Sequence, residues 1–427
     1  MSDPSQSNRA GVYVRQPTGY RAFMPAPLPP VPPIALQGEL PGLLSQADRA
    51  LGRLDGSVLT LPNPDLFIFM YVRKEAVLSS QIEGTQSSLQ DVLAAEAELF
   101  DEQRPHDVGE VINYVRAMHH GLARLSSLPV SLRLVLEIHA KLMRGVRGGH
   151  LQPGELRRSQ NWIGPPGSTL ATAAYVPPPA HEVPQALGDW ERFLHARDEL
   201  PPLVRIALAH VQFETIHPFL DGNGRVGRLL ITFLLTESGI LHKPVLYLSH
   251  YFRMHRQAYY DHLQAVRDRG DWEGWLAFFL RGVIAVAGEA AETARRIQLL
   301  REAHRTIITE QLGRAAGNGH RVLERLFDRP IVSVADVQQV TGTTYVAANT
   351  LVRRMAELGI ISEMTGYARN RRFRYQPYVQ LFTDEGLDGS ALPLFPSAVG
   401  AACAAVHGDG HLRRAGARRS PAPARVR

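Results

Sequence analysis

The sequence predicts an all-α fold for most of the chain, and three observations lead to this prediction. Apolar residues recur at helical spacing through most of the stretch between residues 40 and 300. Segments prone to β structure are confined to a Gly- and Pro-rich stretch and to a short unit near the C-terminus. With 427 residues, of which 44% are hydrophobic and 21% charged, the chain can bury a large core in two or three domains.

The N-terminal part begins with a proline-dense segment and continues as helices. Residues 24–33 are expected to form an extended, polyproline-like strap. Four stretches then show helical spacing: LPGLLSQADRALGRL, NPDLFIFMYVRKEAVLSSQIEG, DVGEVINYVRAMHHGLARL and SLRLVLEIHAKLMRGV. Asn63-Pro64 marks a helix start, and Ser131 is expected to cap the fourth helix. Residues 148–183 are expected to form a loop that carries a small β-hairpin.

Helical spacing returns after residue 183 and continues to the end of QLL at residue 300. A Gly-rich break at 313–320 then precedes a compact unit of helices and β-prone pieces. We expect a helix at 321–327, a short helix capped by Ser333, a TGTT turn, a longer helix at 344–358 and two β-prone pieces around Gly366. This order is similar to that of a winged helix, in which the longer helix is the recognition element.

The positive charge of the chain is unevenly distributed. The net charge is +6 and the sequence pI is about 9.5. Residues 401–427 carry six arginines and one aspartate, and residues 320–382 carry nine arginines and five acidic residues. Any attraction to polyanions therefore belongs to the C-terminal third. The stretch beyond residue 383 is rich in Ala, Gly, Pro and Arg, which is typical of a disordered basic tail.

No targeting or metal-binding pattern is apparent. We expect a cytoplasmic protein with no membrane contact, because the first residues lack a signal-like apolar run and the apolar stretch near residue 280 contains Arg281. The lone Cys403 agrees with a reducing compartment. No zinc pattern appears among the 17 histidines, and no phosphate-binding loop of the GxxxxGK[ST] type is present.

The motif HPFLDGNGRVGRLL at 217–230 combines groups suited to nucleotide chemistry. Gly222 and Gly224 allow backbone N–H groups to approach a ligand at the start of an apolar helix, which is a site for phosphate. Arg225 and Arg228 are three apart and are expected to reach the same polyphosphate. Asp221 suits a magnesium ion that bridges phosphates. His217 suits a general base that takes a proton from an attacking hydroxyl.

These residues match the pattern H-P-F-x-D/E-G-N-G-R-x-x-R of Fic proteins, so the chain resembles that family over about residues 10 to 382. The resemblance implies a Fic-type helical bundle that transfers AMP from ATP, with Mg²⁺, to a Ser, Thr or Tyr hydroxyl of a target protein. It implies His217 as the base and Asp221 as the metal ligand. It places the α and β phosphates on Gly222, Asn223 and Gly224, and the outer ones on Arg225 and Arg228.

An upstream segment resembles the family's inhibitory pattern S/T-x-x-x-E-G/N, through Ser79, Glu83 and Gly84. Ser79 and Glu83 are four apart on one predicted helix, and Gly84 is a helix stop. The resemblance implies that Glu83 pairs with Arg228 and blocks the productive pose of ATP. We therefore expect self-inhibition by a helix on the N-terminal side of the catalytic motif.

Other segments also resemble parts of Fic proteins. Residues 153–179 resemble the flap, a hairpin that aligns the target's modified segment by strand addition. Tyr259 and Tyr260 are expected to line the adenine and ribose, although core packing is an equal alternative for two aromatics at a helix start. His210 lies two turns before His217 on an apolar helix, and we interpret it as structural.

The predicted segments are an N-terminal Fic-associated region with the inhibitory helix (1–110), a Fic catalytic domain (111–300), a linker (301–319), a winged-helix domain (320–382) and a disordered basic tail (383–427). The winged helix is expected to bind DNA, to dock or dimerise, which would make a homodimer, or to act as a spacer. Two alternatives for the function remain. The Fic fold could move another phosphate-containing group, or the body could be the nucleotide sensor of a DNA-binding regulator.

Overall fold

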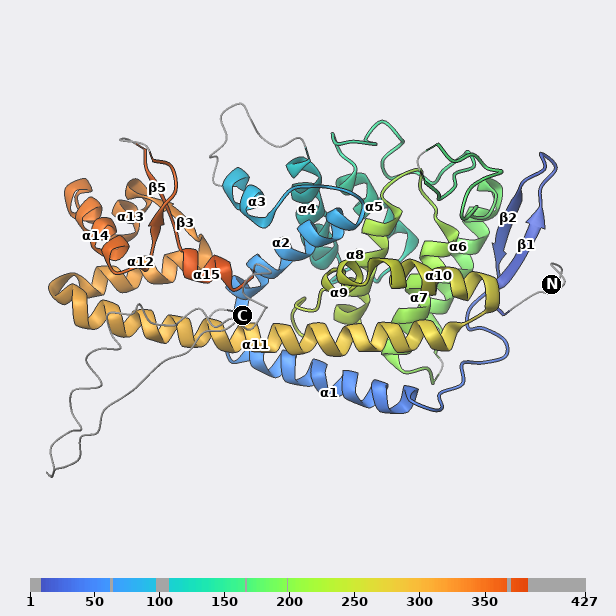
Figure 1. The fold of residues 1–427 in the computed structure, drawn as a ribbon, viewed down its shortest axis with the longest axis horizontal. Helices are drawn as coiled ribbons and strands as arrows, with labels where there is room; N and C mark the ends of the chain where they lie inside the picture. The colour runs from blue at the N-terminus through green and yellow to red at the C-terminus, as the bar shows by residue number, and fades with distance from the viewer. Residues whose placement is uncertain are drawn as a thin grey trace, which may run out of the picture. The chain divides into compact units, whose positions relative to one another are not determined.

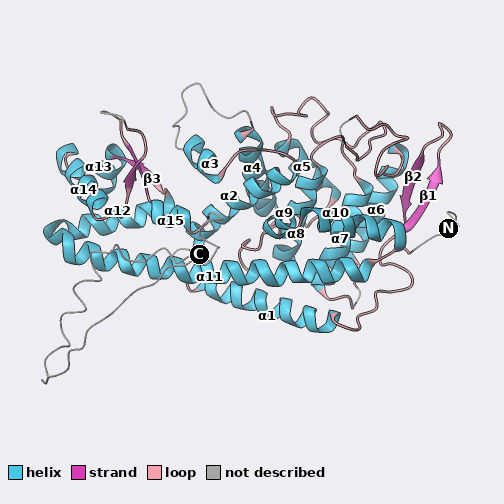
Figure 2. Ribbon diagram, in the orientation of Figure 1, coloured by secondary structure: helices cyan, strands magenta, loops and turns pink. Residues whose placement is uncertain are grey.

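A computed structural model describes residues 9–61, 64–96, 107–165, 167–197, 199–366 and 370–382. The described residues are mostly helical, as the sequence predicts (Figures 1 and 2). Asn63 and the predicted basic tail lie outside the described residues. Residues 1–388 make up one compact unit, to which all of the contacts below belong.

The N-terminal segment forms a β-hairpin that the sequence reasoning missed. Strands β1 (Gly11–Arg15) and β2 (Arg21–Pro25) pair antiparallel, with Tyr13 opposite Phe23. The predicted strap is therefore shorter than expected, because Met24 and Pro25 belong to β2. The remainder of the strap is irregular and contains two cis X-Pro bonds, at Leu28-Pro29 and Val31-Pro32.

The four helices predicted in the N-terminal half are present, and a short fifth one lies among them. They are α1 (Leu40–Leu59), α2 (Pro64–Ile82), α3 (Leu89–Glu96), α4 (Val108–Arg124) and α5 (Leu132–Leu142). Ser131 occupies the N-cap position of α5 in an extended conformation, but its hydroxyl makes no cap hydrogen bond. The carboxylate of Glu191 accepts from the Leu132 N–H at 2.8 Å instead, so a tertiary contact replaces the expected side-chain cap.

The centre of the body is helical. After the short 3-10 helix η1 (Ala180–Glu182) come α6 (Val183–His195), α7 (Pro202–Ile216), α8 (Asn223–Glu237), α9 (Ser249–Met254) and α10 (Arg256–Arg269). Helices α7 and α8 are buried around most of their surface. Every residue of α7 from Ile206 to Ile216 is buried. Gly121 of α4 lies against the ring of Phe233, where a Cβ would approach within 2.2 Å, so α8 and α4 pack closely.

One long helix connects this body to the C-terminal module. Helix α11 (Trp272–Leu312) packs lengthwise against α1 (Figure 1). It continues through most of the predicted linker, and η2 (Gly313–Ala315) and the start of α12 (Ala316–Asp328) occupy the rest. Residues 301–319 are therefore helical and not an irregular break, because buried side chains such as His304 and Ile308 continue the apolar face past residue 300.

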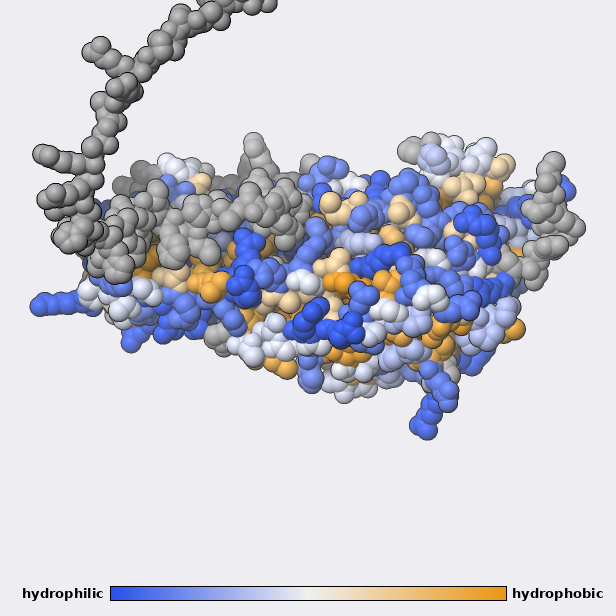
Figure 3. Space-filling view, turned by 60° about the horizontal axis from the view of Figure 1, so that its bottom comes forward, coloured by the Kyte–Doolittle hydropathy of each residue, from blue (hydrophilic) through white to orange (hydrophobic). Residues whose placement is uncertain are grey.

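By length and apolar composition, the stretch that starts at Trp272 could cross a membrane, but 61% of its most apolar window is buried inside the protein. Such a helix is equally typical of a protein core. Figure 3 shows one face of the molecule, on which hydrophobic areas are broken up by hydrophilic ones.

The C-terminal module contains the predicted helices and β pieces in the predicted order, together with strand β3 and helix α15, which were not predicted. Strand β3 (Ile331–Ser333) is followed by α13 (Val334–Thr341), α14 (Tyr345–Glu357), β4 (Ser362–Glu363), β5 (Arg372–Arg374) and α15 (Gln376–Gln380). The sheet order is β3-β5-β4, and both pairings are antiparallel. Ser333 caps α13 as expected, within a complete capping box with Asp336.

Candidate active site

The motif at 217–230 forms the loop between α7 and α8 and the first turns of α8. His217 ends α7 with a φ of 49°, and Gly222 precedes α8 with a φ of 79°. Both lie in the left-handed region, which a histidine adopts at a free-energy cost. The backbone thus reverses twice within six residues, and it brings the end of α7 next to the N-terminus of α8.

Asn223 holds the shape of this loop with its side chain. Its Oδ1 accepts from the Phe219 N–H, and its Nδ2 donates to the Phe219 carbonyl, both at 2.8 Å. The side chain is only 2% exposed. Because both ends of the amide are already bonded, the part of Asn223 left to face a phosphate is its backbone N–H. We therefore expect Asn223 to contact a phosphate through its backbone N–H and not through its side chain.

Three residues outside the motif support the loop from the other side. Arg157 donates from Nε to the His217 carbonyl at 2.9 Å, and Asn161 donates to the Phe219 carbonyl at 2.8 Å. His139 stacks on the Phe219 ring at 3.7 Å between centroids. Because its Nδ1 accepts from the Gly154 N–H, its Nε2 carries the proton and donates to the Asp221 carbonyl at 3.0 Å. The loop geometry is thus fixed in advance of any ligand.

The surroundings of His217 favour its neutral form. Desolvation by burial, together with the positive charges of Arg267 and Arg157, lowers the pKa of His217 to about 3. A neutral imidazole can accept a proton, which is the requirement for a general base.

The first turn of α8 offers the backbone donors that an anion would need. The first intrahelical bond runs from Val226 N to Gly222 O, so the N–H groups of residues 223–225 precede the helical ladder. The carboxylate of Glu83 lies directly above this turn. A Cβ on Gly224 would come within 2.3 Å of Glu83 Oε1, so only glycine permits this approach.

The inhibitory pattern and the motif meet at Arg228. Its Nε donates to the Ser79 hydroxyl at 2.8 Å, and its Nη2 donates to the Ser79 carbonyl at 2.9 Å and to Glu83 Oε1 at 2.8 Å. Desolvation raises the pKa of Glu83, but the charge and hydrogen bond of Arg228 outweigh it and leave this pKa below its usual value. Helix α2 ends just before Gly84, which has a φ of 96°, as expected for a helix stop.

Arg225 faces in a different direction from Arg228, contrary to the expectation that both would reach one polyphosphate. Its Nη1 donates to Glu110 Oε2 at 3.0 Å, and both side chains are almost fully buried. Its Nη2 lies 3.6 Å from Asp221 Oδ1, and its Nε has no partner among the described residues. The buried carboxylate of α4 draws the guanidinium away, which sequence spacing alone does not reveal.

Asp221 is the one acidic side chain of the loop. Its carboxylate is 37% exposed and accepts from the Gly222 N–H at 2.6 Å. No group of three or more His, Cys, Asp or Glu side chains suited to a metal occurs among the described residues. A single hard oxygen donor fits a Mg²⁺ ion that takes its other ligands from water and from nucleotide phosphates.

Of the two tyrosines expected at the nucleotide, only Tyr260 reaches the surface. Tyr260 is 37% exposed, whereas Tyr259 is 1% exposed and stacks on Phe252. The Tyr259 hydroxyl bonds His210 Nε2 at 2.9 Å, and His210 Nδ1 lies 3.1 Å from the Gly227 carbonyl. The prediction that Tyr259 lines the nucleotide does not fit this burial, while the structural interpretation of His210 is confirmed.

The predicted flap is mostly irregular. A single bridge pairs Ile163 with Tyr175 through two hydrogen bonds, of 2.8 and 3.0 Å, in place of a full hairpin. It is anchored beside the catalytic loop, because the Tyr175 hydroxyl donates to the Thr215 carbonyl at 2.6 Å. Trp162 next to the bridge is 43% exposed.

Sequence reasoning missed Glu110, His139, Arg157 and Asn161. Charged or polar residues within apolar helical spacing were the available signal for Glu110 and His139. Nothing in the sequence distinguishes Arg157 from the adjacent Arg158, which is exposed and pairs with Glu155.

Comparison with known proteins agrees with this geometry. Residues 42–123 match the family model "Fic/DOC family N-terminal", and residues 129–235 match "Fic/DOC family". The chain is 31% identical over 201 residues to "Protein adenylyltransferase Fic" of Aedes aegypti, across 45% of this chain and 35% of that protein. The same protein of Drosophila erecta is 30% identical over 200 residues, with the same two shares. The match therefore spans about a third of the length of these curated relatives.

The fold has a solved counterpart. A Fic family protein from Desulfovibrio desulfuricans G20 is 22% identical and aligns with a TM-score of 0.53, covering 80% of this chain and 97% of that one. The expected Fic-type helical fold is confirmed.

Proposed function

Because this chain belongs to the Fic/DOC family, we propose that it is a protein adenylyltransferase, which transfers AMP from ATP to a hydroxyl side chain of another protein and releases pyrophosphate. The observation that carries the proposal is a neutral His217 beside the N-terminus of α8. The names of the curated relatives support the same reaction class.

The reaction follows from these positions. His217 takes the proton of the target's hydroxyl as its oxygen attacks the α-phosphorus of ATP. A phosphorus–oxygen bond forms, the bond to the bridging oxygen of the β-phosphate breaks, and pyrophosphate carries away that electron pair. The backbone N–H groups of Asn223 and Gly224 stabilise the charge that develops on the phosphate oxygens, and Gly222, whose N–H donates to Asp221, allows the phosphate to approach closely.

Asp221 is the residue that would hold Mg²⁺, which neutralises phosphate charge when it is bound with the nucleotide. Arg228 would hold the terminal phosphate once its present partner leaves. Tyr260 is the exposed aromatic available to the nucleoside. The exposed flap around Trp162 would align the target's segment by main-chain pairing.

We also propose that Glu83 restrains the reaction. Its carboxylate lies on Gly224 and bonds Arg228, so it occupies the anion position at the start of α8. ATP must displace this carboxylate before Arg228 can bind a phosphate. The 35% exposure of the Glu83 side chain supports a contact that opens without unfolding.

The test is transfer of label from ATP carrying radioactive phosphorus at the α position, in a lysate of the source cell. We expect Glu83→Gly to label a discrete band more strongly than the wild-type chain at several ATP concentrations. We expect the additional His217→Ala change to abolish this labelling. Equal labelling by the wild-type chain and Glu83→Gly would refute the restraint, and labelling without His217 would refute the mechanism.

The alternatives are tested by repeating the assay with other labelled donors and by a DNA-binding measurement. Label from UTP, a choline-containing nucleotide or the γ-phosphate of ATP, and not from the α position, would assign another phosphate-containing cargo. Absence of transfer by Glu83→Gly, together with retarded migration of specific DNA, would favour a DNA-binding regulator with a nucleotide-sensing body.

We propose further that residues 320–382 form a winged helix. The order of elements from α12 to β5 supports this assignment. The exposed Tyr345 and Val346, at 55% and 75%, begin the helix α14 that such a fold would present to a partner. Tyr345→Ala with Val346→Ala is expected to weaken that contact, which gel retardation on DNA and sedimentation for a homodimer would measure.

A further inference from the structure

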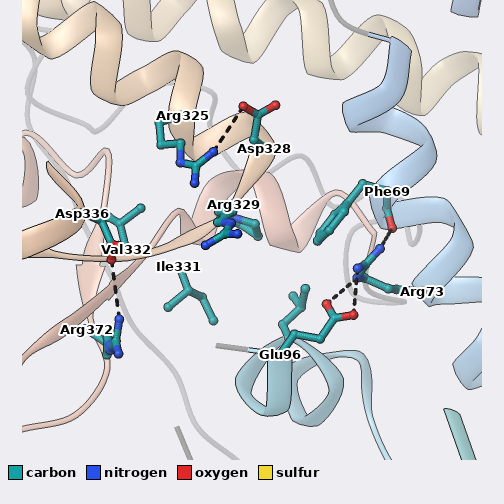
Figure 4. Close-up of a pocket in the computed structure, with 12 residues that line it drawn as sticks. Phe69, Arg73, Glu96, Arg325, Asp328, Arg329, Ile331, Val332, Asp336 and Arg372 are labelled. Atoms are coloured by element: carbon teal, nitrogen blue, oxygen red, sulfur yellow. Dashed lines mark hydrogen bonds and ion pairs between the residues drawn. The ribbon is translucent and has the colours of Figure 1, made fainter. Parts of the chain in front are cut away.

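A cavity of about 540 Å³ lies between the N-terminal helices and the C-terminal module, away from the catalytic loop (Figure 4). On one side it is lined by α2 and α3, through residues that include Phe69 and Arg73. On the other side it is lined by α12, β3, α13 and β5. Its volume is within the range of small-molecule sites, and the proposed transfer reaction uses none of its residues.

Three arginines that line this cavity have guanidinium N–H groups that are available to a ligand. The guanidinium groups of Arg325, Arg329 and Arg372 make no hydrogen bond within the described part of the chain. Arg325 lies 3.7 Å from Asp328, and Arg372 lies 3.6 Å from Asp336, distances at which the charges interact without a hydrogen bond. These pairs are partly exposed and therefore weak, so an incoming anion can compete for the guanidinium groups.

The fourth arginine of the cavity is already committed. Arg73 bonds both oxygens of Glu96, at 2.6 and 2.8 Å, and donates to the Phe69 carbonyl at 2.8 Å. It also lies over the Phe69 ring, at 3.2 Å from the centroid. Arg73 therefore forms part of the wall, and the open donors come from the C-terminal side alone.

The apolar side chains that line the cavity set a second requirement on a ligand, besides the negative charge that the arginines favour. Phe69, Leu93, Ile331 and Val332 present apolar surface between the charged groups. Planar guanidinium forks match the oxygens of phosphate, and three of them suit a dianion better than a single carboxylate. A ligand that uses both features carries a phosphate group on an apolar or aromatic body.

We infer that this cavity is a binding site for a small phosphate monoester with an apolar body, held by Arg325, Arg329 and Arg372. Asp328 and Asp336 also line it, and their charges limit the site to one phosphate group. The site lies on the module that the sequence shows to be rich in arginine.

Helix α2 connects this cavity to the catalytic loop, and this consequence rests on the proposed restraint by Glu83. Phe69 lies in the second turn of the helix and Arg73 at its middle, and Ser79 on its last turn bonds Arg228. The helix is continuous between these positions, with a rise of about 1.5 Å per residue. Phe67 and Tyr71 of α2 also pack on Phe382 of the module. A ligand that changes the packing between the module and α2 therefore changes how firmly Glu83 is held.

Binding is tested by titration calorimetry of phenyl phosphate into the full chain. We expect one site, whose affinity falls about tenfold or more in Arg329→Ala, since a hydrogen bond to a charged group is lost. Arg353→Ala removes an exposed arginine of the same module outside the cavity and should leave the affinity unchanged. Absence of binding, or equal affinity in Arg329→Ala and wild type, would overturn the site. A loss of binding in Arg228→Ala but not in Arg329→Ala would assign the phosphate to the catalytic loop and would overturn it as well.

The connection to α2 is tested separately, by measuring transfer of label from ATP with and without saturating phenyl phosphate. We expect the ligand to change the rate for the wild-type chain and to leave Glu83→Gly unaffected, since that variant has lost the contact that α2 carries. Equal effects on both forms would refute the connection. If Glu83→Gly transfers no label at all, the proposed function fails, whereas calorimetry still decides the cavity.

Discussion

Arg228 and Arg225 lie three residues apart on α8 but form two different kinds of ion pair. Arg228 pairs with Glu83, whose side chain is 35% exposed, whereas Arg225 pairs with Glu110, whose side chain is 5% exposed. The partly exposed carboxylate of Glu83 can be replaced by a ligand, because Arg228, itself 2% exposed, keeps its hydrogen bonds to Ser79 when Glu83 leaves. A buried pair cannot lose one member without leaving a charge in an apolar interior. We infer that the first pair serves regulation and the second serves architecture.

The largest expected effect is on stability, and it tests whether the two ion pairs differ in their contribution to the free energy of unfolding. Glu110→Ala leaves Arg225 buried without its partner and is expected to lower the free energy of unfolding by about 3 to 5 kcal/mol. Glu83→Ala should lower it less, by about 1 to 3 kcal/mol, because the buried Arg228 keeps its two hydrogen bonds to Ser79. Urea unfolding followed by tryptophan fluorescence measures both variants. Equal losses would mean that the two pairs do not differ as their burial suggests.

A second prediction concerns the loop that both arginines follow. Asn223→Ala leaves the Phe219 N–H without its partner, which we expect to lower the free energy of unfolding by about 1 to 3 kcal/mol. The shifted loop should also slow transfer about a hundredfold in a Glu83→Gly background, since small misplacements are costly. Asn161→Ala is the matched control, because it removes one of two donors to the Phe219 carbonyl and should have a smaller effect. The reverse order of these two variants would contradict the role given to Asn223.

A third prediction concerns Ser79, which bonds the arginine of the Arg228–Glu83 pair. Ser79→Ala removes the acceptor of Arg228 Nε, and we expect it to raise wild-type transfer about fivefold, as the loss of a hydrogen bond worth about 1 kcal/mol would. Ser80→Ala is the control, since the Ser80 hydroxyl is buried next to it but has no partner among the described residues. Activation by Ser80→Ala to the same extent would point to a general loosening of α2.

The smallest expected effect is that of pH on the catalytic step. The pKa of His217 is lowered to about 3, so the neutral base is the main form well above that pH. The transfer rate of Glu83→Gly should therefore change less than about twofold between pH 5 and 8 on account of this group. The lowered pKa of His217 also makes the free energy of unfolding depend on pH. The contribution of His217 to this free energy is fully present above the pKa of the unfolded chain, about 6.5, and is lost as pH falls toward 3. A rate that falls with a midpoint near pH 6.5 would show that His217 titrates normally.

Much of the fold could be predicted because its signals are local. The periodic apolar residues of α1, α2 and α4 and the cap at Ser333 act within a few residues of one another. The N-terminal hairpin was missed because Phe23 and its neighbours are stabilised by distant residues, among them Tyr175. The helical state of residues 301–319 was missed because glycine signals were given more weight than buried packing.

The sequence by itself determined the helices, the ordered motif from His217 to Arg228 and the pattern of Ser79, Glu83 and Gly84, because each is a set of residue types at fixed short spacing. Tertiary structure alone decided that Glu83 lies on Gly224, that Arg225 faces Glu110, that Tyr259 is buried and that three arginines line one side of a cavity. The reason is physical. The direction of a long charged or aromatic side chain depends on the charges and apolar surfaces that neighbouring helices bring to it, and these neighbours come from distant parts of the chain.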